Sequence, residues 1–301
     1  MFDLVAIGNP VYDEIATPYI RSEGRVLSGC STNACLAARK LGLSKVGFVG
    51  CIGRDYEEQF RKEMARYGVD LSGVKVGQTT GGFKLVYDKA GNRTLDVIEV
   101  SDKILPQDIP LEYLDSRVIL IGPILGETDI ELIRFIRKNS RAKLFLDPQG
   151  MVRQVDATGR VRDFSNAYAT MEYASLVDFI KPNEHEAKVM TGHEDPYYSA
   201  RLMVDWGAEV GIVTLAERGS IIAKERNILR ILAYKTLAKD PTGAGDTYAG
   251  AFITKYLSGA NLYQCGLFAS AAASIKVEHI GPNFPLELSE VERRARKLFG
   301  D

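Results

Sequence analysis

Short runs of hydrophobic residues alternate along this chain with stretches in which hydrophobic positions recur at helical spacing. The runs are nearly continuous in Val, Ile, Leu and Phe, as is typical of strands buried on both faces of a parallel sheet. Six such runs occupy residues 3–8, 46–52, 117–122, 143–147, 177–181 and 209–215. Helical stretches with a start or stop signal occupy residues 32–42, 54–68 and 128–139. The alternation predicts an α/β fold in which helices cover both faces of a mostly parallel sheet.

Two segments, residues 10–28 and 79–102, break this pattern because polar and hydrophobic residues alternate along them. The second contains a predicted hairpin turn at residues 88–92, with the sequence Asp-Lys-Ala-Gly-Asn. We therefore expect a small antiparallel sheet that stands off the main layer and is a candidate lid. The alternative is that these segments form an ordinary solvated edge of the main sheet.

The C-terminal part of the chain is predicted to be helical, over residues 244–260, 262–278 and 289–300. The first two stretches are rich in Ala and Gly, which would let the helices approach each other or a flat ligand closely. The third has the pattern of a charged amphipathic helix. A strand-rich part of the chain is therefore expected to precede a helical tail.

Composition limits the classes of function. The chain has 301 residues, of which 46% are hydrophobic, enough for one large α/β domain or two ordinary ones. The formal net charge of -1 supplies no general field that would attract nucleic acid or an anionic membrane. The four cysteines lack metal-ligand spacing and are expected to be reduced thiols. Because the N-terminus has no leader pattern or membrane span, we expect a cytoplasmic protein.

Residues 240–252, with the sequence Asp-Pro-Thr-Gly-Ala-Gly-Asp-Thr-Tyr-Ala-Gly-Ala-Phe, predict a tight turn that leads into a helix. Gly243 and Gly245 leave backbone N–H groups unshielded at the helix N-terminus, where the helix dipole favours an anion such as phosphate. Asp246 would repel that anion, but it suits a base that accepts the proton of an attacking hydroxyl. The alternative is that Asp246 only caps the helix.

Other catalytic signatures are missing from the sequence. It contains no Walker-type phosphate loop, and the Gly-rich segment does not match the dinucleotide-binding fingerprint. Hydrolase and protein-kinase signatures are also missing. The three histidines lack the spacing of metal ligands. Because these signatures are missing, residues 240–252 remain as the candidate catalytic segment.

Residues 240–252 closely resemble the C-terminal signature of the PfkB or ribokinase family of sugar and nucleoside kinases. Five further stretches resemble motifs of that family in the same order, at residues 28–42, 46–74, 145–153, 181–192 and 213–220. The resemblance covers nearly the whole chain. It implies a ribokinase-like three-layer α/β/α fold in a single kinase domain over residues 1–301, with the lid inserted in it.

The resemblance also implies roles for residues at the site of phosphoryl transfer. Asp246 would be the general base. The N–H groups that would form an anion hole for the phosphoryl group belong to Gly243, Ala244 and Gly245. Asn183 and Glu186 match the family's NxxE motif and would hold Mg²⁺, Asn183 through water. The alternative for Asn183 and Glu186 is a polar helix cap.

Substrate-binding residues are implied in the same way. Those for the acceptor are Asp13, Gly29 and Asn33. Asp13 and Asn33 follow strands whose carboxyl ends face the crevice of a parallel sheet. The alternative for Asp13 is that it is only a residue of a turn. Those for the nucleotide are Asn183, Thr214, Gly219, Ala272 and Gly281. Asp240 would contribute to a site for a monovalent cation such as K⁺.

Three positions depart from the family's pattern. Ser28 stands where the family has the first glycine of a pair, which affects the shape of the acceptor pocket. Ala216 replaces a glycine, and the segment 268–274 has Ser and Ala where an Asn often contacts adenine. The last two departures concern how the base of the nucleotide is held. The donor is expected to be ATP, with ADP as the alternative.

The predicted function is an ATP- and Mg²⁺-dependent transfer of a phosphoryl group to a hydroxyl of a sugar or sugar-like polyol. A nucleoside kinase acting on adenosine, cytidine, or inosine or guanosine is the first alternative. A non-catalytic sensor of sugars or nucleotides is the second, but it would not need a base. We also expect a homodimer formed through the lid, and no nucleic-acid or membrane partner.

Overall fold

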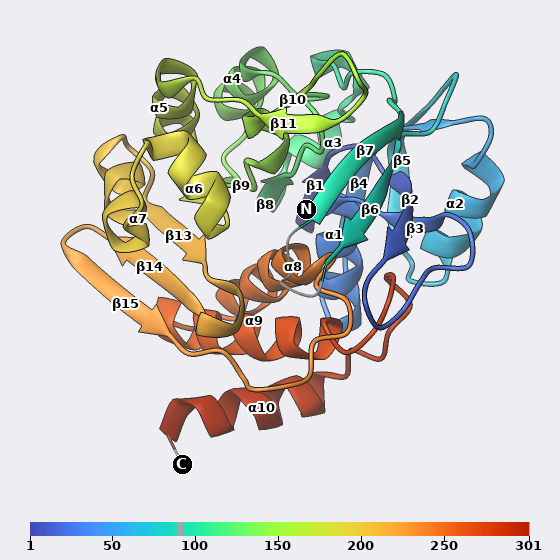
Figure 1. The fold of residues 1–301 in the computed structure, drawn as a ribbon. Coiled ribbons are helices and arrows are strands. Elements are labelled where there is room, and N and C mark those ends of the chain that lie inside the picture. Colours follow the sequence, from blue (N-terminus) through green and yellow to red (C-terminus); the bar gives the residue numbers. More distant parts are fainter. Residues whose placement is uncertain (89–92, 301) are drawn as a thin grey trace.

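The computed structural model describes residues 1–88 and 93–300, so most of the predicted turn at 88–92 lies outside the described residues. Within this part of the chain, the strands of the main sheet follow the order β15-β14-β13-β12-β9-β8-β1-β4-β5 (Figure 1). They are β1 (Phe2–Ile7), β4 (Val46–Gly53), β5 (Asp70–Gly77), β8 (Ser116–Ile121), β9 (Lys143–Leu146), β12 (Phe179–Ile180), β13 (Val210–Thr214), β14 (Ser220–Lys224) and β15 (Asn227–Ile231). Each of the six predicted runs contributes one of these strands.

The pairings from β13 across to β5 are parallel, and only β14 and β15 add antiparallel neighbours at one edge. In the centre, Ala6 of β1 pairs with Phe48 of β4 on one side and with Leu120 of β8 on the other. These three residues are fully buried. Continuous hydrophobic runs suit such strands because both faces of the sheet are covered. The predicted mostly parallel sheet is therefore confirmed.

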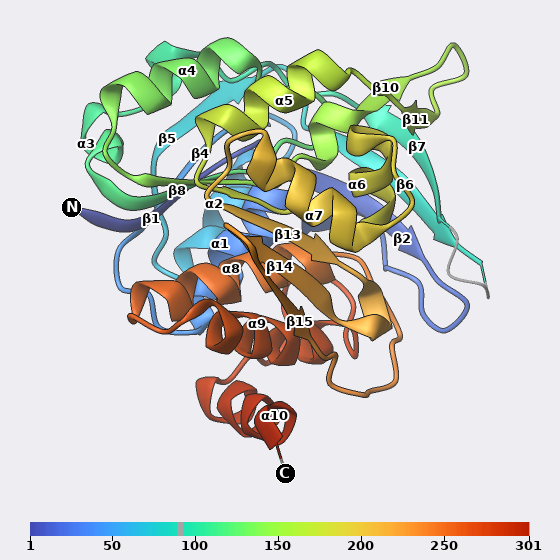
Figure 2. The same ribbon diagram turned by 90° about the vertical axis from the view of Figure 1, so that its left-hand side faces the viewer.

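Helices cover both faces of the sheet, as the two views show together (Figures 1 and 2). One layer contains α1 (Cys30–Lys40), α2 (Glu57–Ala65), α8 (Ala244–Leu257) and α9 (Leu262–Lys276), with α10 (Leu288–Gly300) packed outside α9. The other contains α3 (Leu111–Leu114), α4 (Ile130–Asn139), α5 (Ala167–Leu176), α6 (Glu184–Thr191) and α7 (Pro196–Asp205). Gly250 of α8 lies so close to α1 that a side chain there would overlap the Ala34 carbonyl. The small residues of α8 therefore let this helix approach α1 closely.

A second, four-stranded sheet stands beside the main sheet, in the order β3-β2-β6-β7. It consists of β2 (Val11–Ala16), β3 (Val26–Ser28), β6 (Gly82–Tyr87) and β7 (Arg93–Glu99). The β2–β3 and β6–β7 pairs are antiparallel as predicted, whereas β2 and β6 pair in parallel, with Ile15 opposite Leu85. The two segments therefore form a separate sheet, and the alternative of a main-sheet edge was wrong. We call this four-stranded sheet the lid.

Shorter elements complete the described chain. They are the hairpin of β10 (Arg153–Val155) and β11 (Val161–Asp163) and the 3-10 turns at Pro106–Asp108, Gln149–Val152 and Ala216–Arg218. The four cysteines are all buried and free. Among the described helices, none combines the length and the hydrophobicity that crossing a bilayer would require.

Candidate active site

A cavity of about 1080 Å³ opens where the parallel strands end, between the lid and the start of α8. This is the edge at which α/β sheets bind ligands, because the carboxyl ends of neighbouring strands meet there. Ten predicted site residues line the cavity, namely Asp13, Gly29, Asn183, Glu186, Thr214, Gly219, Gly243, Ala244, Gly245 and Asp246. Segments from all parts of the chain therefore meet at one place.

The glycine-rich turn forms the start of α8. Gly243 is the N-cap residue and has a left-handed backbone, with φ 78° and ψ 4°, which glycine adopts readily. The helix begins at Ala244, so the N–H groups of its first turn have no partner within the helix. One of the three predicted donors is already engaged, because the Ala244 N–H donates to the Pro241 carbonyl at 3.2 Å. The remaining amides, those of Gly243 and Gly245, border the cavity.

Asp246 lies in the first turn of α8, three residues beyond the N-cap, and its side chain does not cap the helix. The capping alternative was therefore wrong. Its Oδ2 accepts a hydrogen bond of 2.9 Å from Asn33 Nδ2. Burial raises the pKa of Asp246, and the negative charge of Asp147 adds to this, whereas Asn33 and Lys181 act in the opposite direction. A carboxylate with a raised pKa, open to a cavity, is suited to accept a proton.

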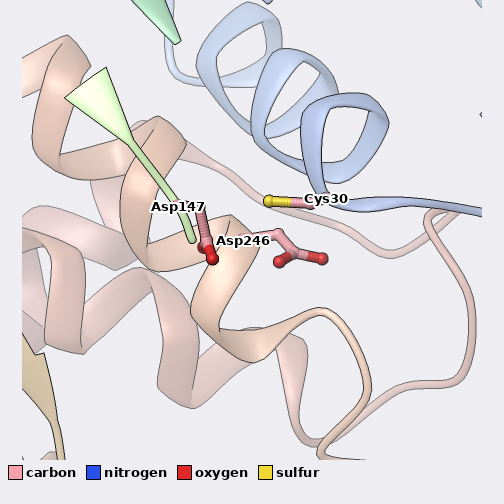
Figure 3. A group of neighbouring side chains, drawn as sticks. All are labelled: Cys30, Asp147 and Asp246. Carbon is pink, nitrogen blue, oxygen red and sulfur yellow. The ribbon is translucent and has the colours of Figure 1, made fainter. Parts of the chain in front are cut away.

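Figure 3 shows Asp246 of α8, Asp147 at the end of β9 and Cys30 at the start of α1 gathered around one point. Their ligand atoms lie within 4.8 Å of one another. Burial raises the pKa of the Cys30 thiol well above its ordinary value, and both carboxylates add to this. Cys30 is therefore a neutral neighbour of Asp246.

Lys181 balances this group of acids and was not singled out from the sequence. Its Nζ lies 2.8 Å from Asp147 Oδ2, and each side chain is only 3% exposed. Burial alone would lower the pKa of Lys181, but the Asp147 charge and hydrogen bond raise it above its ordinary value. The ammonium also lies close to Gly245, 3.4 Å from where a Cβ would stand on that residue. Lys181 and Asp147 both belong to stretches that resemble the family's motifs, so the sequence contained a signal for this pair.

Asn183 and Glu186 form a reciprocal cap at the start of α6. The Glu186 N–H donates to Asn183 Oδ1 at 2.8 Å, and the Asn183 N–H donates to Glu186 Oε2 at 2.9 Å. The capping alternative is therefore present, but it uses only one carboxylate oxygen. The other, Oε1, lies 3.9 Å from an Arg153 nitrogen. Burial and the Asp147 charge raise the pKa of Glu186, while Arg153 opposes this. A divalent cation held by Glu186 would relieve this crowding of acids, so the residues fit Mg²⁺.

The acceptor end of the cavity combines one acid with hydrophobic walls. Asp13 of β2 is 3% exposed, and its Oδ1 accepts the Phe83 N–H of the lid at 2.9 Å. Gly29 has φ 114°, and a Cβ there would lie 3.0 Å from the Asn9 carbonyl oxygen. The hydrophobic walls are Val11, Phe83, Leu85, Leu95 and Ile124. Asn33, predicted for this end, is instead engaged with Asp246.

The donor end follows the end of β13. The Thr214 N–H donates to the Pro182 carbonyl at 3.2 Å, which joins this strand to the segment before α6. Gly219 has φ 93°. Ala216, which replaces a glycine of the family's pattern, adopts a left-handed φ of 51°. Glycine suits that position because a side chain adds strain there.

Four predicted residues, Asn33 among them, do not line the cavity. Ala272 of α9 is fully buried in the core, and its neighbours Ala273 and Ser274 line the cavity instead. Gly281 lies beyond α9, outside the lining. Asp240 is fully buried, and its Oδ2 lies 3.3 Å from Lys276 Nζ. At Ala272 the sequence did not reveal which side of α9 faces the cavity, because the phase of a helix against its neighbours cannot be read from spacing.

Known proteins share the pattern of the whole chain. The sequence model of the pfkB family carbohydrate kinases matches residues 1–288. A cytidine kinase of Thermococcus kodakarensis is 30% identical over 275 residues, which are 88% of this chain and 92% of the relative. A ribokinase of Haemophilus influenzae is 26% identical over 89% of each chain. A solved pyrophosphate-dependent kinase in the ribokinase family, in complex with sulfate, has TM-score 0.83 at 22% identity over 96% of this chain and 99% of its own.

The family match spans the chain almost from end to end, and five of the six stretches on which the resemblance was based contribute residues to one cavity. The chain therefore belongs to the pfkB family of carbohydrate kinases and is a phosphotransferase with an alcohol group as acceptor.

Proposed function

We propose that the protein transfers the terminal phosphoryl group of ATP, with Mg²⁺, to a hydroxyl of a nucleoside. The observation that carries this choice is the hydrophobic acceptor end of the cavity. Val11, Phe83, Leu85 and Leu95 of the lid, with Ile124, offer apolar surface against which a nucleobase would pack. These five side chains offer the hydroxyls of a free sugar no hydrogen-bond partner. The identity of 30% with a cytidine kinase supports the same choice.

Asp13 supplies the polar part of the proposed acceptor site. A carboxylate accepts hydrogen bonds from two vicinal hydroxyls, such as those of a ribose. Its Oδ1 already accepts the Phe83 N–H. The same side chain would therefore join strands β2 and β6 of the lid and contact the sugar. Gly29, without a side chain, leaves room for the sugar beside the backbone.

The length of the donor end supports a nucleotide as phosphoryl donor. The cavity continues from the α8 turn past Thr214 and Gly219 to Tyr234 and Ser274. A phosphoryl donor without a base and a ribose would leave this part of the cavity unfilled. ATP is therefore the proposed donor, and ADP remains the alternative to test.

In the proposed reaction, Asp246 accepts the proton of the acceptor hydroxyl as the new oxygen–phosphorus bond forms. The bond to the leaving ADP breaks in the same transfer. The amides of Gly243 and Gly245, with the Lys181 ammonium nearby, would stabilise the negative charge of the transferring group. Mg²⁺ at Glu186, when bound, would neutralise charge on the donor phosphates. The lid would exclude water from the transfer, which suppresses hydrolysis of the donor.

A substrate panel tests the proposal. Cytidine, uridine, adenosine, inosine, ribose, deoxyribose, fructose and myo-inositol are each offered with ATP, ADP or pyrophosphate, and phosphorylated products are identified by ³¹P NMR. We expect kcat/KM for a nucleoside with ATP to exceed that for any free sugar by about ten-fold or more. Asp246→Asn serves as the control that turnover belongs to this chain. Phosphorylation of free sugars in preference to nucleosides would overturn the choice of acceptor.

A further inference from the structure

A buried ion pair lies behind the phosphate-binding turn, outside the cavity lining. Asp240 is 0% exposed and Lys276, the last residue of α9, is 2% exposed. Lys276 Nζ lies 3.3 Å from Asp240 Oδ2 and donates to the His279 carbonyl at 2.8 Å. Burial lowers the pKa of Lys276, but the charge and hydrogen bond of Asp240 oppose this. A fully buried charge is stable only where such partners satisfy it.

The pair is connected to the turn through the backbone. Asp240 Oδ1 accepts the Thr242 N–H at 2.9 Å, and Thr242 directly precedes Gly243. The N–H groups of Lys239 and Asp240 both donate to the Val277 carbonyl, at 2.7 and 3.1 Å. Lys276 Cε lies 3.5 Å from where a Cβ would stand on Gly243. The ammonium is therefore anchored directly beneath the N-cap of α8.

The resemblance implied a monovalent cation at Asp240, and the residues present do not fit one. A K⁺ ion at this position would take the Asp240 carboxylate and neighbouring carbonyl oxygens as ligands. Asp240 Oδ2 and the His279 carbonyl are the oxygens to which Lys276 donates. An ammonium group carries the same charge as K⁺ and resembles it in size. The side chain therefore occupies the position that a bound cation would need.

We propose that Lys276 acts as a tethered cation at Asp240, in place of a dissociable K⁺ ion, and so positions the phosphate-binding turn. The protein is then independent of monovalent cations, whereas a chain without this lysine would need one. Lys276 does not line the cavity, so it is a positioning residue and touches neither substrate. The proposal rests on the proposed function in one respect only, because its kinetic measurements need the phosphotransferase activity.

The test compares two ways of removing the charge. Lys276→Ala leaves both the Asp240 carboxylate and space for an ion, whereas Lys276→Met removes the charge but fills the space. Rates and melting temperatures are measured in KCl, NH₄Cl, NaCl and choline chloride at equal ionic strength. Lys40→Met is the matched control, because Lys40 Nζ is also a partly buried ammonium that donates to carbonyls of the same segment, those of Pro282 and Phe284, without contacting Asp240.

We expect the unchanged protein and Lys40→Met to give the same rate in K⁺ and choline. Lys276→Ala should lose about ten-fold or more in kcat in choline, because displacement of catalytic groups is costly, and should regain activity in K⁺ or NH₄⁺. Its melting temperature should rise selectively in K⁺, and Lys276→Met should respond to no salt. Stimulation of the unchanged protein by K⁺, or a Lys276→Ala variant that ignores K⁺ in both readouts, would overturn the proposal.

The melting measurement separates this proposal from the proposed function. It needs no substrate, so a selective K⁺ shift in Lys276→Ala supports the tethered cation even if the substrate panel gives no product. If Lys276→Ala unfolds in choline, recovery of its folded circular dichroism spectrum in KCl is the supporting result. Failure to fold in every salt counts against it. The double variant Asp240→Asn/Lys276→Ala removes the carboxylate as well and should show no K⁺ shift.

Discussion

Asn33 Nδ2 donates a hydrogen bond of 2.9 Å to Asp246 Oδ2, and this bond joins the first helix of the chain to α8. The two residues are 213 positions apart in the sequence. Both helices begin at the cavity, so the bond fixes the side chain of the proposed base relative to the acceptor end. That Asn33 binds the acceptor stays a prediction, and the contact that the structure shows is the one with Asp246.

Removing the Asn33 amide should move the pH dependence of the reaction. Asn33 favours the ionised form of Asp246, whose pKa is already raised by burial and by Asp147. The base works only when ionised, so activity falls as the pH drops through its pKa. In Asn33→Ala the pKa rises further, and the acid limb of the kcat/KM profile should shift to higher pH. Asn261→Ala, which removes the N-cap of α9, is the control and should leave the limb in place.

Asp246→Asn should abolish most of the activity without unfolding the protein. Loss of a general base typically lowers kcat by about 10² to 10⁴. The raised pKa of Asp246 means that the charged form is disfavoured in the folded state at neutral pH. The neutral amide removes that penalty, so the melting temperature should stay the same or rise. Near-normal turnover in this variant would refute the assignment of the base.

Glu186→Gln should weaken the response to magnesium while α6 stays capped. A glutamine Oε1 can still accept the Asn183 N–H, but it brings no charge to a cation. We expect the Mg²⁺ concentration for half-maximal rate to rise by about 10- to 100-fold, the range seen when outer ligands of metal sites are altered. Glu194→Gln, which removes an exposed acid paired with Lys188, is the control. An unchanged Mg²⁺ dependence would leave Glu186 as a helix cap only.

The sequence predicted the buried strands well, because strands covered on both faces need continuous hydrophobic runs. It missed β5, whose residues Asp70–Gly77 are mostly half-buried or exposed at the sheet edge. The sequence identified ten of the cavity residues, nine of them within the motifs. Lys181 and Lys276 were missed because each acts through an ion pair with a carboxylate of another segment. The partners are Asp147 and Asp240, respectively. Such pairings depend on which strand and helix ends meet, and spacing along one segment carries no information about that.

Two predicted nucleotide-binding glycines should respond differently to alanine. A Cβ at Gly219 would overlap the Ile231 carbonyl oxygen, and the backbone has φ 93°. Overlap with backbone and strain together should cost about 3–5 kcal/mol in the free energy of unfolding. Gly281 has φ 66° and no atom within 4 Å of its Cβ position, so Gly281→Ala should cost only about 1–2 kcal/mol. Urea unfolding of both variants measures the difference, and equal losses would contradict this reading of the turn after β13.

Lys181 should be needed mainly because it neutralises the acids around it. Its Nζ pairs with Asp147, and its charge lowers the pKa of both Asp246 and Glu186. Lys181→Met leaves the Asp147 carboxylate buried without its partner, which typically costs about 3–5 kcal/mol. The double variant Asp147→Asn/Lys181→Met removes both charges, so most of that stability should return.

Activity should not return with stability in the double variant. Without the ammonium, the group beside Gly245 that would stabilise the transferring phosphoryl is missing. Urea unfolding and steady-state kinetics on the unchanged protein, Lys181→Met and the double variant therefore separate the two roles of Lys181. A double variant that regains both stability and kcat would show that Lys181 serves only as the partner of Asp147. One that regains stability alone would place Lys181 among the groups that act on the phosphoryl.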